Sequence, residues 1–498
     1  MSSARTLSAA AGAALSLRPN ESALESLAAH LKRPGAGSTA VVVGASLAGL
    51  LAARVLADRF DNVVLLDRGD LPDGDANRKA TPHTLHAHGL LARGRQVLED
   101  LFPGIRDDWL AQGATVHDMH RHVAFYVGRR RYAQGLAGEP LVALGRAAIE
   151  GSVRRRVMAL PNVHALGCVS VDALVLARVG RRVGGVSVTP EDDDLRLTLP
   201  AQLVVDAAGR ASALPRWLGA MGHTPPQEER IAVSMRYATV QLDIDRRHAP
   251  REMAVLCAAT PDCPRPAMLL RQDGVRWLLT LGGYGNDAPP LDPTAFRARA
   301  LGAAPEIARA VARAHFISTP QPYHFAYSLR RRYEDLRSLP DGVVVIGDAL
   351  CSLNPIHGQG MAVAATQAQV LRECLAEGTD QLAQRFFKSA TRIVDLAWSA
   401  AQRADLVMPG VKGTLTPMAR LANAYAARLH RAAQTDPDVA LAALEVTHLL
   451  AGPGHLMRPG MLWRVLRLKR RPMVARRGEG SPTVTVAVRK RRGPAERG

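Results

Sequence analysis

The chain has 498 residues, which at about 150 residues per domain predicts two or three domains with a large core. Its net charge of +19 raises the question of a nucleic-acid partner. Residues 464–498 alone hold twelve Lys or Arg and two Glu, so much of the excess charge lies in a tail. We therefore expect no nucleic-acid partner. Five cysteines without metal-finger spacing predict reduced thiols, no zinc motif and a cytoplasmic protein.

The two ends of the chain predict extensions rather than domains. Residues 1–38 are rich in Ala and Ser, which predicts a disordered extension, with a transit peptide as the alternative and a short helix over 22–32. Residues 471–498 predict a basic disordered tail. No apolar run is long enough to span a bilayer. Apolar and basic residues alternate over 456–469, which indicates a core-facing helix or, as the alternative, peripheral membrane contact by the C-terminal helices and tail.

Residues 40–68 predict a strand, a tight turn, a helix and a second strand. Gly44 permits the turn and Gly49 lets the helix pack closely on the sheet, while Ser46 replaces the middle glycine of the usual G-x-G-x-x-G pattern. The helix N-terminus offers unpaired N–H groups to a pyrophosphate. Asp67, after the second strand, can accept hydrogen bonds from ribose hydroxyls. The stretch predicts a dinucleotide site without choosing between NAD and FAD.

Residues 83–156 contain three closely spaced histidines and an arginine that are candidates for ligand binding. His83, His86 and His88 lie within six residues, but no carboxylate or cysteine stands near them at ligand spacing, so we expect no metal site. Short strands are predicted over 115–134. Arg146 opens a predicted helix over 146–156, where it could reach a phosphate or ribose, and a surface arginine is an equally good interpretation.

Two further patterns place acids at the ends of buried strands. Residues 163–199 predict a β-meander, and residues 203–206 predict a buried strand that ends on Asp206, at the carboxyl edge where ligands bind in α/β sheets. Gly209 and Arg210 follow in the run Asp-x-x-Gly-Arg. Strand-like runs within 231–283 predict a separate antiparallel sheet, which could wall an apolar cavity.

The third pattern is a buried strand that ends in Gly347-Asp348, followed by a loop and a helix. Gly347 admits close approach of a ligand to the backbone, and Asp348 can bind the hydroxyls of a ribityl chain. Residues 358–361 begin the helix, whose positive end would stabilise the anionic side of a reduced flavin. Residues 382–468 are predicted to be mostly helical.

Together, the three patterns resemble the FAD-dependent monooxygenases that use a single flavoprotein chain, the group of aromatic hydroxylases and squalene epoxidase. In that family the first pattern holds the ADP half of FAD, the second contacts FAD and is linked to NAD(P)H use, and the third holds the ribityl chain. The cofactor-binding residues that the resemblance implies are Gly44, Ser46, Gly49, Asp67, Arg68, Arg78, Arg146, Asp206, Gly209, Arg210, Gly347, Asp348, Pro355, Gly358, Gly360 and Met361.

A closer resemblance is to the bacterial squalene-epoxidase-like branch, which includes polyether epoxidases and typically shows R-K-G-V-P-Q-x-x-H-x-H after the second strand. Five residues match this pattern and three depart from it, and Ala207 replaces a glycine of the second pattern. The matching residues are Arg78, Lys79, Pro82, His86 and His88, and the departures are Ala80, Thr81 and His83.

The resemblance implies an α/β (α+β) fold, with a Rossmann-like FAD-binding domain of the aromatic-hydroxylase type, an inserted antiparallel-sheet substrate domain and a C-terminal helical region. The expected FAD-binding domain is discontinuous, and the expected substrate domain has two pieces. The expected boundaries are 1–38 for the extension, 39–114, 140–220 and 323–385 for the FAD-binding domain, 115–139 and 221–322 for the sheet domain, 386–470 for the helices and 471–498 for the tail.

The implied activity is insertion of one oxygen atom of O2 into an apolar substrate, through a flavin C4a-hydroperoxide, with NADPH or NADH as cosubstrate. This chemistry needs a positioned flavin and exclusion of water rather than a side-chain nucleophile, so we expect no single indispensable acid or base. The alternatives are a flavin-dependent reductase of polyprenyl double bonds, which would consume no oxygen, and a non-catalytic binding protein on the same scaffold. A nucleic-acid-binding protein is the last alternative.

Overall fold

A computed structural model describes residues 21–72, 74, 82–177, 182–191, 195–272 and 276–467. Within the expected N-terminal extension, α1 (Glu21–Leu31) is a helix, and its Leu24, Ala28 and Leu31 are buried. These side chains recur at helical spacing and form one apolar face, and α1 contacts strand β10. The short helix expected over 22–32 is therefore confirmed, while residues 21–31 are not part of a disordered extension. Residues 1–20 and the tail 471–498 lie outside the described residues.

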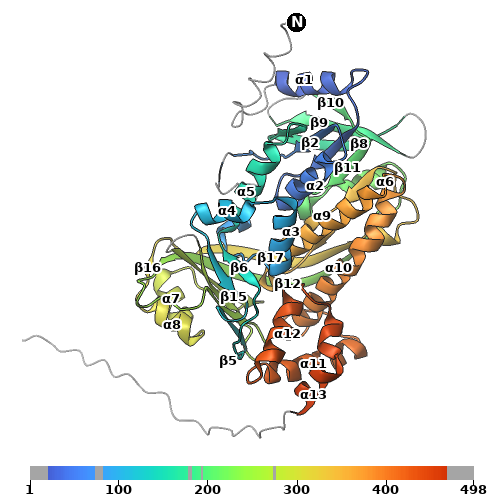
Figure 1. Cartoon of the computed structure of the whole chain (residues 1–498). Coiled ribbons are helices and arrows are strands. Elements are labelled where there is room, and N and C mark those ends of the chain that lie inside the picture. The colour runs from blue at the N-terminus through green and yellow to red at the C-terminus, as the bar shows by residue number, and fades with distance from the viewer. Residues whose placement is uncertain are drawn as a thin grey trace, which may run out of the picture.

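One half of the molecule is built on a five-stranded parallel sheet in the order β18-β11-β1-β2-β7 (Figure 1). Four of these strands are buried along their whole length, as expected for a parallel sheet covered on both faces. The strands are β1 (Thr39–Val43), β2 (Asn62–Leu66), β7 (Val163–Leu166), β11 (Leu203–Asp206) and β18 (Val343–Val345).

Helices and a small antiparallel sheet complete this half. Helix α2 follows β1 and packs against both α5 and α9, while the sheet β10-β9-β8 lies beside β11 and β2. The helices are α2 (Leu47–Ala57), α3 (Ala92–Leu101), α4 (Ile105–Ala111), α5 (Arg146–Met158), α6 (Leu214–Ala220) and α9 (Gly360–Ala376). The remaining strands are β8 (Val169–Leu176), β9 (Val183–Pro190), β10 (Leu197–Pro200), and the pair β3 (Thr115–Asp118) and β6 (Pro140–Ala143).

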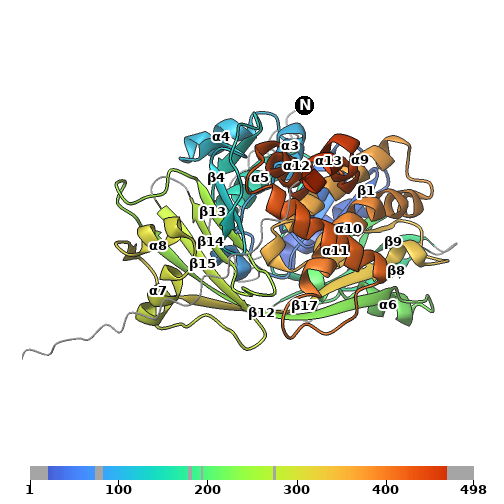
Figure 2. The same ribbon diagram turned by 90° about the horizontal axis from the view of Figure 1, so that it is seen from below.

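The other half is a nine-stranded, mostly antiparallel sheet that extends away from the first half (Figure 2). It contains the strands expected within 231–283, and it also recruits β17, which crosses the expected boundary at residue 323. The strands are β4 (Val123–Val127), β5 (Arg130–Arg131), β12 (Gln227–Asp243), β13 (Ala254–Ala258), β14 (Ala267–Arg271), β15 (Arg276–Tyr284), β16 (His315–Phe316), β17 (Gln321–Arg332) and β19 (Cys351–Ser352).

Both faces of the large sheet are covered. Because side chains alternate along a strand, successive residues point to the helices on one face or to the cavity on the other. Trp277, Leu279 and Leu281 of β15 pack against α7 (Pro293–Leu301) and α8 (Pro305–Val311). The intervening Thr280 and Gly282 face a cavity on the other side of the sheet. Strand β12 belongs to both halves, because it pairs with β17 along most of its length and with β15 only from residue 235 onward. A β-bulge with Ser234 at φ +42° separates the two parts.

Four helices end the described chain: α10 packs along α9, and the other three lie beside the large sheet (Figures 1 and 2). They are α10 (Leu382–Asp405), α11 (Pro417–Ala432), α12 (Pro437–Thr447) and α13 (Pro459–Arg467). In α13, Val465 is buried while Trp463 and Leu466 are more than half exposed, so this helix is only partly core-facing. Among the residues with described positions, none of the helices has the length and apolar character that crossing a membrane requires.

Candidate functional site

The turn between β1 and α2 depends on two glycines. Gly44 has φ +100°, and a Cβ there would lie 2.5 Å from the carbonyl oxygen of Ala207 at the end of β11. A Cβ at Gly49 would lie 1.7 Å from the carbonyl oxygen of Gly44. Ser46 is the N-cap residue of α2, but its side chain does not cap the helix. The turn is therefore tight, and the first N–H groups of α2 have no side-chain cap from Ser46.

The Ser46 hydroxyl is instead held by a buried acid that sequence reasoning missed. It donates a hydrogen bond to Oε2 of Glu150 at 3.1 Å, and Arg154 donates to Oε1 of Glu150 at 3.2 Å. Glu150 is 2% exposed and lies 104 residues from Ser46 in the chain. No local pattern connects residues so far apart, so only the packing of α5 against α2 could have revealed this contact.

Asp67 organises the end of β2 through the backbone. Its Oδ2 accepts a hydrogen bond from the N–H of Ala45 at 2.7 Å, and its Oδ1 accepts from the N–H of Gly69 at 2.8 Å. The carboxylate thus joins the first turn to the end of β2, where a ribose would lie by analogy with dinucleotide sites. Arg68 is exposed, and Arg78 lies outside the described residues.

Asp206 closes the turn after β11. It is 2% exposed, the Ser212 hydroxyl donates to its Oδ2, and the N–H of Ala208 donates to its Oδ1 at 3.0 Å. Burial raises the pKa of the Asp206 carboxyl, and the hydrogen bond from Ser212 opposes this. Both oxygens are engaged within the protein. Asp206 therefore shapes the turn that carries Gly209 and Arg210.

The turn after Asp206 is tied to the third pattern by an arginine that sequence reasoning also missed. Arg331 of β17 is buried and donates to the carbonyl oxygens of Ala349 at 2.9 Å and Arg210 at 3.0 Å. It also pairs with Glu228 of β12 at 2.9 Å. The guanidinium of Arg210 lies over the rings of Phe325 and Tyr327, at 4.6 and 4.7 Å from their centroids.

Gly347 brings the third pattern against the first. It has φ +64°, its N–H donates to Gln367 Oε1 at 2.6 Å, and a Cβ there would lie 2.7 Å from the Cβ of Ala48 in α2. Asp348 is exposed and accepts a hydrogen bond from the Ser352 hydroxyl at 3.2 Å. Although the Asp348 side chain is accessible, many protein atoms surround it, and this partial desolvation raises the pKa of its carboxyl, while the positive charge of Arg146 opposes the shift.

The loop before α9 leaves its backbone open to a ligand. Pro355 begins a 3-10 turn (Pro355–His357), and Gly358 follows at φ +66°. A Cβ at Gly358 or Gly360 would meet no atom within 4 Å among the described residues. Gly360 is the first residue of α9, and Met361, the second, is buried. An accessible backbone at the N-terminus of a long helix is suited to negative charge.

Arg146 lies between these loops and the large sheet. It is the first residue of α5, and its Nε is buried without a hydrogen-bond partner in the described part of the chain. Its charge acts on the pKa values of His88, Tyr237, Tyr323 and Asp348, so it is central to this region. A buried N–H that lacks an acceptor, beside open glycine loops and the exposed Asp348, fits the polar groups of FAD.

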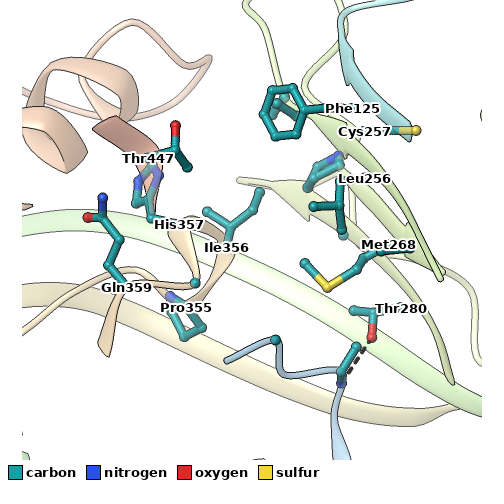
Figure 3. Close-up of a pocket in the computed structure, with 18 of the residues that line it drawn as sticks. Phe125, Leu256, Cys257, Met268, Thr280, Pro355, Ile356, His357, Gln359 and Thr447 are labelled. Carbon is teal, nitrogen blue, oxygen red and sulfur yellow. Dashed lines mark hydrogen bonds between the residues drawn. The ribbon is translucent and has the colours of Figure 1, made fainter. Parts of the chain in front are cut away.

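A cavity of about 460 Å³ adjoins this region. It lies between the large sheet and the loop 355–359, which is where the sequence analysis expected an apolar cavity. Figure 3 shows Phe125, Leu256 and Met268 on one side and His357, Gln359 and Thr447 on the other. The cavity is therefore apolar on its sheet side and more polar on the side of the loop and C-terminal helices.

Three histidines that line the cavity are neutral at ordinary pH. Burial lowers the pKa of His430 and of His448 to about 4. Burial, together with the charge of Arg146, lowers the pKa of His88 to about 3. The described residues contain no group of three His, Cys, Asp or Glu side chains arranged to hold a metal ion. His86, one of the three histidines that the sequence analysis considered for a metal, forms a hydrogen bond through its Nδ1 with Thr239 Oγ1 at 2.8 Å.

Comparison with solved structures defines the fold. PqsL of Pseudomonas aeruginosa, described as a probable FAD-dependent monooxygenase, has a TM-score of 0.58 and 18% identity, covering 74% of this chain and 97% of that one. p-Nitrophenol 4-monooxygenase PnpA of Pseudomonas putida has a TM-score of 0.58 and 17% identity, covering 84% and 99%. The flavin-dependent brominase Bmp2 has a TM-score of 0.59 and 17% identity, covering 82% and 92%.

Sequence relatives agree with this fold. The chain is 36% identical over 348 residues to protein Rv3254 of Mycobacterium tuberculosis, covering 68% of this chain and 72% of that protein. It is 26% identical over 359 residues to kynurenine 3-monooxygenase of Salinispora tropica, covering 68% and 73%. No protein-family model matches the chain.

The chain therefore has the fold of the FAD-dependent monooxygenases among the solved structures, and its sequence is similar to that of a kynurenine 3-monooxygenase. The chain belongs to the same family as protein Rv3254.

Proposed function

We propose that this protein uses FAD and NADPH or NADH to insert one oxygen atom of O2 into an apolar organic substrate. One observation carries the proposal: the 355–358 loop, which precedes the open N-terminus of α9, also forms a wall of the 460 Å³ cavity. A substrate in this cavity would therefore lie against the loop that we assign to the flavin. That arrangement suits the direct transfer of an atom between cofactor and substrate.

When bound, FAD would accept reducing equivalents from NAD(P)H and transfer one oxygen atom of O2. The protein's own residues would bind and orient the cofactor. Asp348 would accept hydrogen bonds from the ribityl hydroxyls, Arg146 would donate to an acceptor on the cofactor, and the start of α9 would stabilise negative charge. The apolar cavity wall excludes water, which protects a reactive oxygen species from loss.

The kind of oxygenation follows from the branch of the family. We infer the squalene-epoxidase-like branch from Pro82, His86 and His88, with Arg78 and Lys79 outside the described residues, and this branch favours an alkene or an aromatic ring as the oxygenated group. His86 supports the inference, because its imidazole packs edge-on against Tyr237 and Tyr323 at centroid distances of 4.8 and 5.4 Å. The motif thus helps to build the wall between the cofactor loops and the sheet.

The purified protein tests this proposal directly. We would record its flavin spectrum and then NADPH and NADH oxidation with oxygen consumption, with and without a panel of apolar alkenes and aromatics. Bound FAD, oxygen uptake stimulated by a panel compound, and a product that carries label from 18O2 are the expected results. Flavin that is reduced or oxidised with a panel compound, without oxygen uptake, would overturn the proposal in favour of a reductase.

A matched variant separates the cavity from the cofactor site. Met268 of β14 lines the cavity away from the glycine loops, so Met268→Trp should fill part of the cavity and leave FAD content unchanged. Stimulation of oxygen uptake by the largest active compounds should fall at least about tenfold, because they no longer fit. Unchanged stimulation would mean that this cavity does not hold the substrate.

A further inference from the structure

A fully buried carboxylate lies behind the polar wall of the cavity. Asp405, the last residue of α10, has no exposed surface, and its Oδ1 accepts three hydrogen bonds. The donors are the Tyr284 hydroxyl at 2.9 Å, Asn354 Nδ2 at 2.9 Å and His357 Nε2 at 3.1 Å. A buried charge is costly unless it is paired or well hydrogen-bonded. The three donors come from two segments, β15 and the loop 354–357, and converge on one oxygen, while the buried Oδ2 has no hydrogen-bond partner among the described residues.

The contact with Asp405 fixes the tautomer of His357. A carboxylate only accepts hydrogen bonds, so Nε2 of His357 carries the hydrogen and donates it. In the neutral ring, Nδ1 is then left with a lone pair. Nδ1 has no hydrogen-bond partner among the residues that the structure describes, and His357 lines the cavity with its side chain 20% exposed. In Figure 3, His357 stands on the side of the cavity opposite Leu256.

Two other polar side chains on this wall of the cavity are already engaged. The Thr447 hydroxyl donates to the Ala443 carbonyl at 2.9 Å, and Nδ1 of His448 accepts from the N–H of Ala92 at 3.2 Å. Gln359 Oε1 also lacks a partner in the described chain, but this atom is buried from the cavity surface. His357 Nδ1 is thus an acceptor that remains available to a ligand on this wall of the cavity.

We propose that His357, held by Asp405, accepts a hydrogen bond from a hydroxyl group of the substrate. The ligand class is then an apolar molecule with one hydroxyl, a phenol or an alcohol, whose polar end reaches the 355–358 loop. Asp405 is a positioning residue, because it acts through His357. This inference deepens the proposed function and rests on it for the statement that the cavity ligand is the substrate.

The test compares two ligands that differ only in that a methyl group replaces the hydroxyl hydrogen. Holoprotein with oxidised FAD, without NADPH, is titrated calorimetrically with 2-naphthol and with 2-methoxynaphthalene. A hydrogen bond to a polar group is worth roughly 1 to 1.5 kcal/mol, so we expect wild type to bind 2-naphthol about tenfold more tightly. His357→Phe should abolish this preference and keep the affinity for the ether. Asp405→Asn should weaken the preference, because the ring is less firmly held.

Two further variants keep the test decisive. Thr447→Val removes a cavity hydroxyl that already donates to a carbonyl, so the naphthol preference should stay at its wild-type value. His357→Asn keeps a side-chain oxygen near the position of Nδ1 and should retain part of the preference, even if the bulkier Phe disturbs the loop. FAD content and melting temperature, measured on each variant, separate a lost anchor from a damaged fold.

Equal binding of the two ligands by wild type would overturn the proposal, as would binding of neither ligand or a preference that survives His357→Phe. Oxygen uptake with NADPH, measured on the same preparations, distinguishes this failure from failure of the proposed function. Absence of the preference in wild type, with oxygen uptake intact, overturns the hydroxyl anchor alone. A preference without any oxygen uptake overturns the monooxygenase assignment and leaves the anchor standing.

Discussion

The glycine loops of the parallel-sheet half and the cavity walls of the large-sheet half are specified by different chemistry. At the loops, backbone meets backbone, and an added Cβ at Gly44 or Gly49 would overlap a carbonyl oxygen. At the cavity, side chains of alternating strand residues set size and polarity, while the opposite face holds the sheet to α7 and α8. The glycine loops of the parallel-sheet half therefore tolerate few substitutions, whereas we expect the cavity to be able to change its ligand without losing the fold.

The largest effect that this comparison predicts is at Gly49. Gly49→Ala places a Cβ 1.7 Å from the Gly44 carbonyl oxygen, so backbone must move, and we expect the free energy of unfolding to fall by about 3 kcal/mol or more, with loss of FAD. Chemical denaturation and flavin absorbance measure both. Gly219→Ala in α6 is the control, since its nearest contact would be an ordinary 3.6 Å, and it should not destabilise the protein. Similar values for the two variants would contradict the account of the turn.

At Asp348 the expected effect is on the cofactor alone. Asp348→Ala removes a carboxylate that we assign to the ribityl hydroxyls, and charged hydrogen bonds of this kind are worth roughly 1.5 to 3 kcal/mol, so FAD should bind about 10 to 100 times more weakly. Asp341→Ala, exposed at the other end of β18, should retain wild-type affinity. The dissociation constant follows from the fluorescence of released FAD. A variant that purifies with full, tightly bound flavin would refute the assignment.

Acid should weaken the cavity half first. His88, His430 and His448 have pKa values near 3 to 4 in the fold, below the ordinary value of 6.5, so the unfolded chain binds protons that the fold excludes. Stability is therefore complete above pH 6.5 and is lost as the pH falls toward 4, by up to about 1.4 kcal/mol per pH unit for each histidine. Denaturation between pH 7 and 4.5 measures this slope. His448→Gln should make it shallower, and an unchanged slope would show that His448 is not the source.

The smallest effect is expected at the C-terminus. Deletion of 471–498, outside the described residues, should leave flavin content and melting temperature unchanged, because no contact that we assign to FAD involves it. Deletion from residue 459 also removes α13, whose Val465 is buried against α11 and α12, and should lower the melting temperature. Loss of FAD on the shorter deletion would show that the tail supports the cofactor half.

Sequence reasoning recovered the features that local spacing encodes. The β1–α2–β2 unit, the strand before Gly347, the helix after Gly358 and the strands of the large sheet are each defined by residues close together in the chain. The contacts between these elements could not be predicted from the sequence. The contact of Ser46 with Glu150 spans 104 residues, and Arg331 joins Arg210 to Ala349 from a different sheet.

The cavity, too, could be predicted from the sequence only in part. Its location beside the sheet could be expected, because strand alternation assigns one face to a cavity once the other face is covered. Its polar wall could not, because Asp405, His357 and Tyr284 come from segments that share no motif. The helix α1 was expected, but the burial of its three apolar residues was not, since they stand in a stretch whose composition resembles a flexible leader.

Because of the bulge at Ser234, the two parts of β12 can report ligand binding in the two halves of the molecule separately. On one side of the bulge, Glu228 is tied through Arg331 to the cofactor loops, and on the other side Met235 and Tyr237 border the cavity. Amide hydrogen exchange along this single strand can therefore report the two halves separately. Protection gained at 228–232 would register the arrival of the cofactor, and protection gained at 235–242 would register the arrival of a cavity ligand.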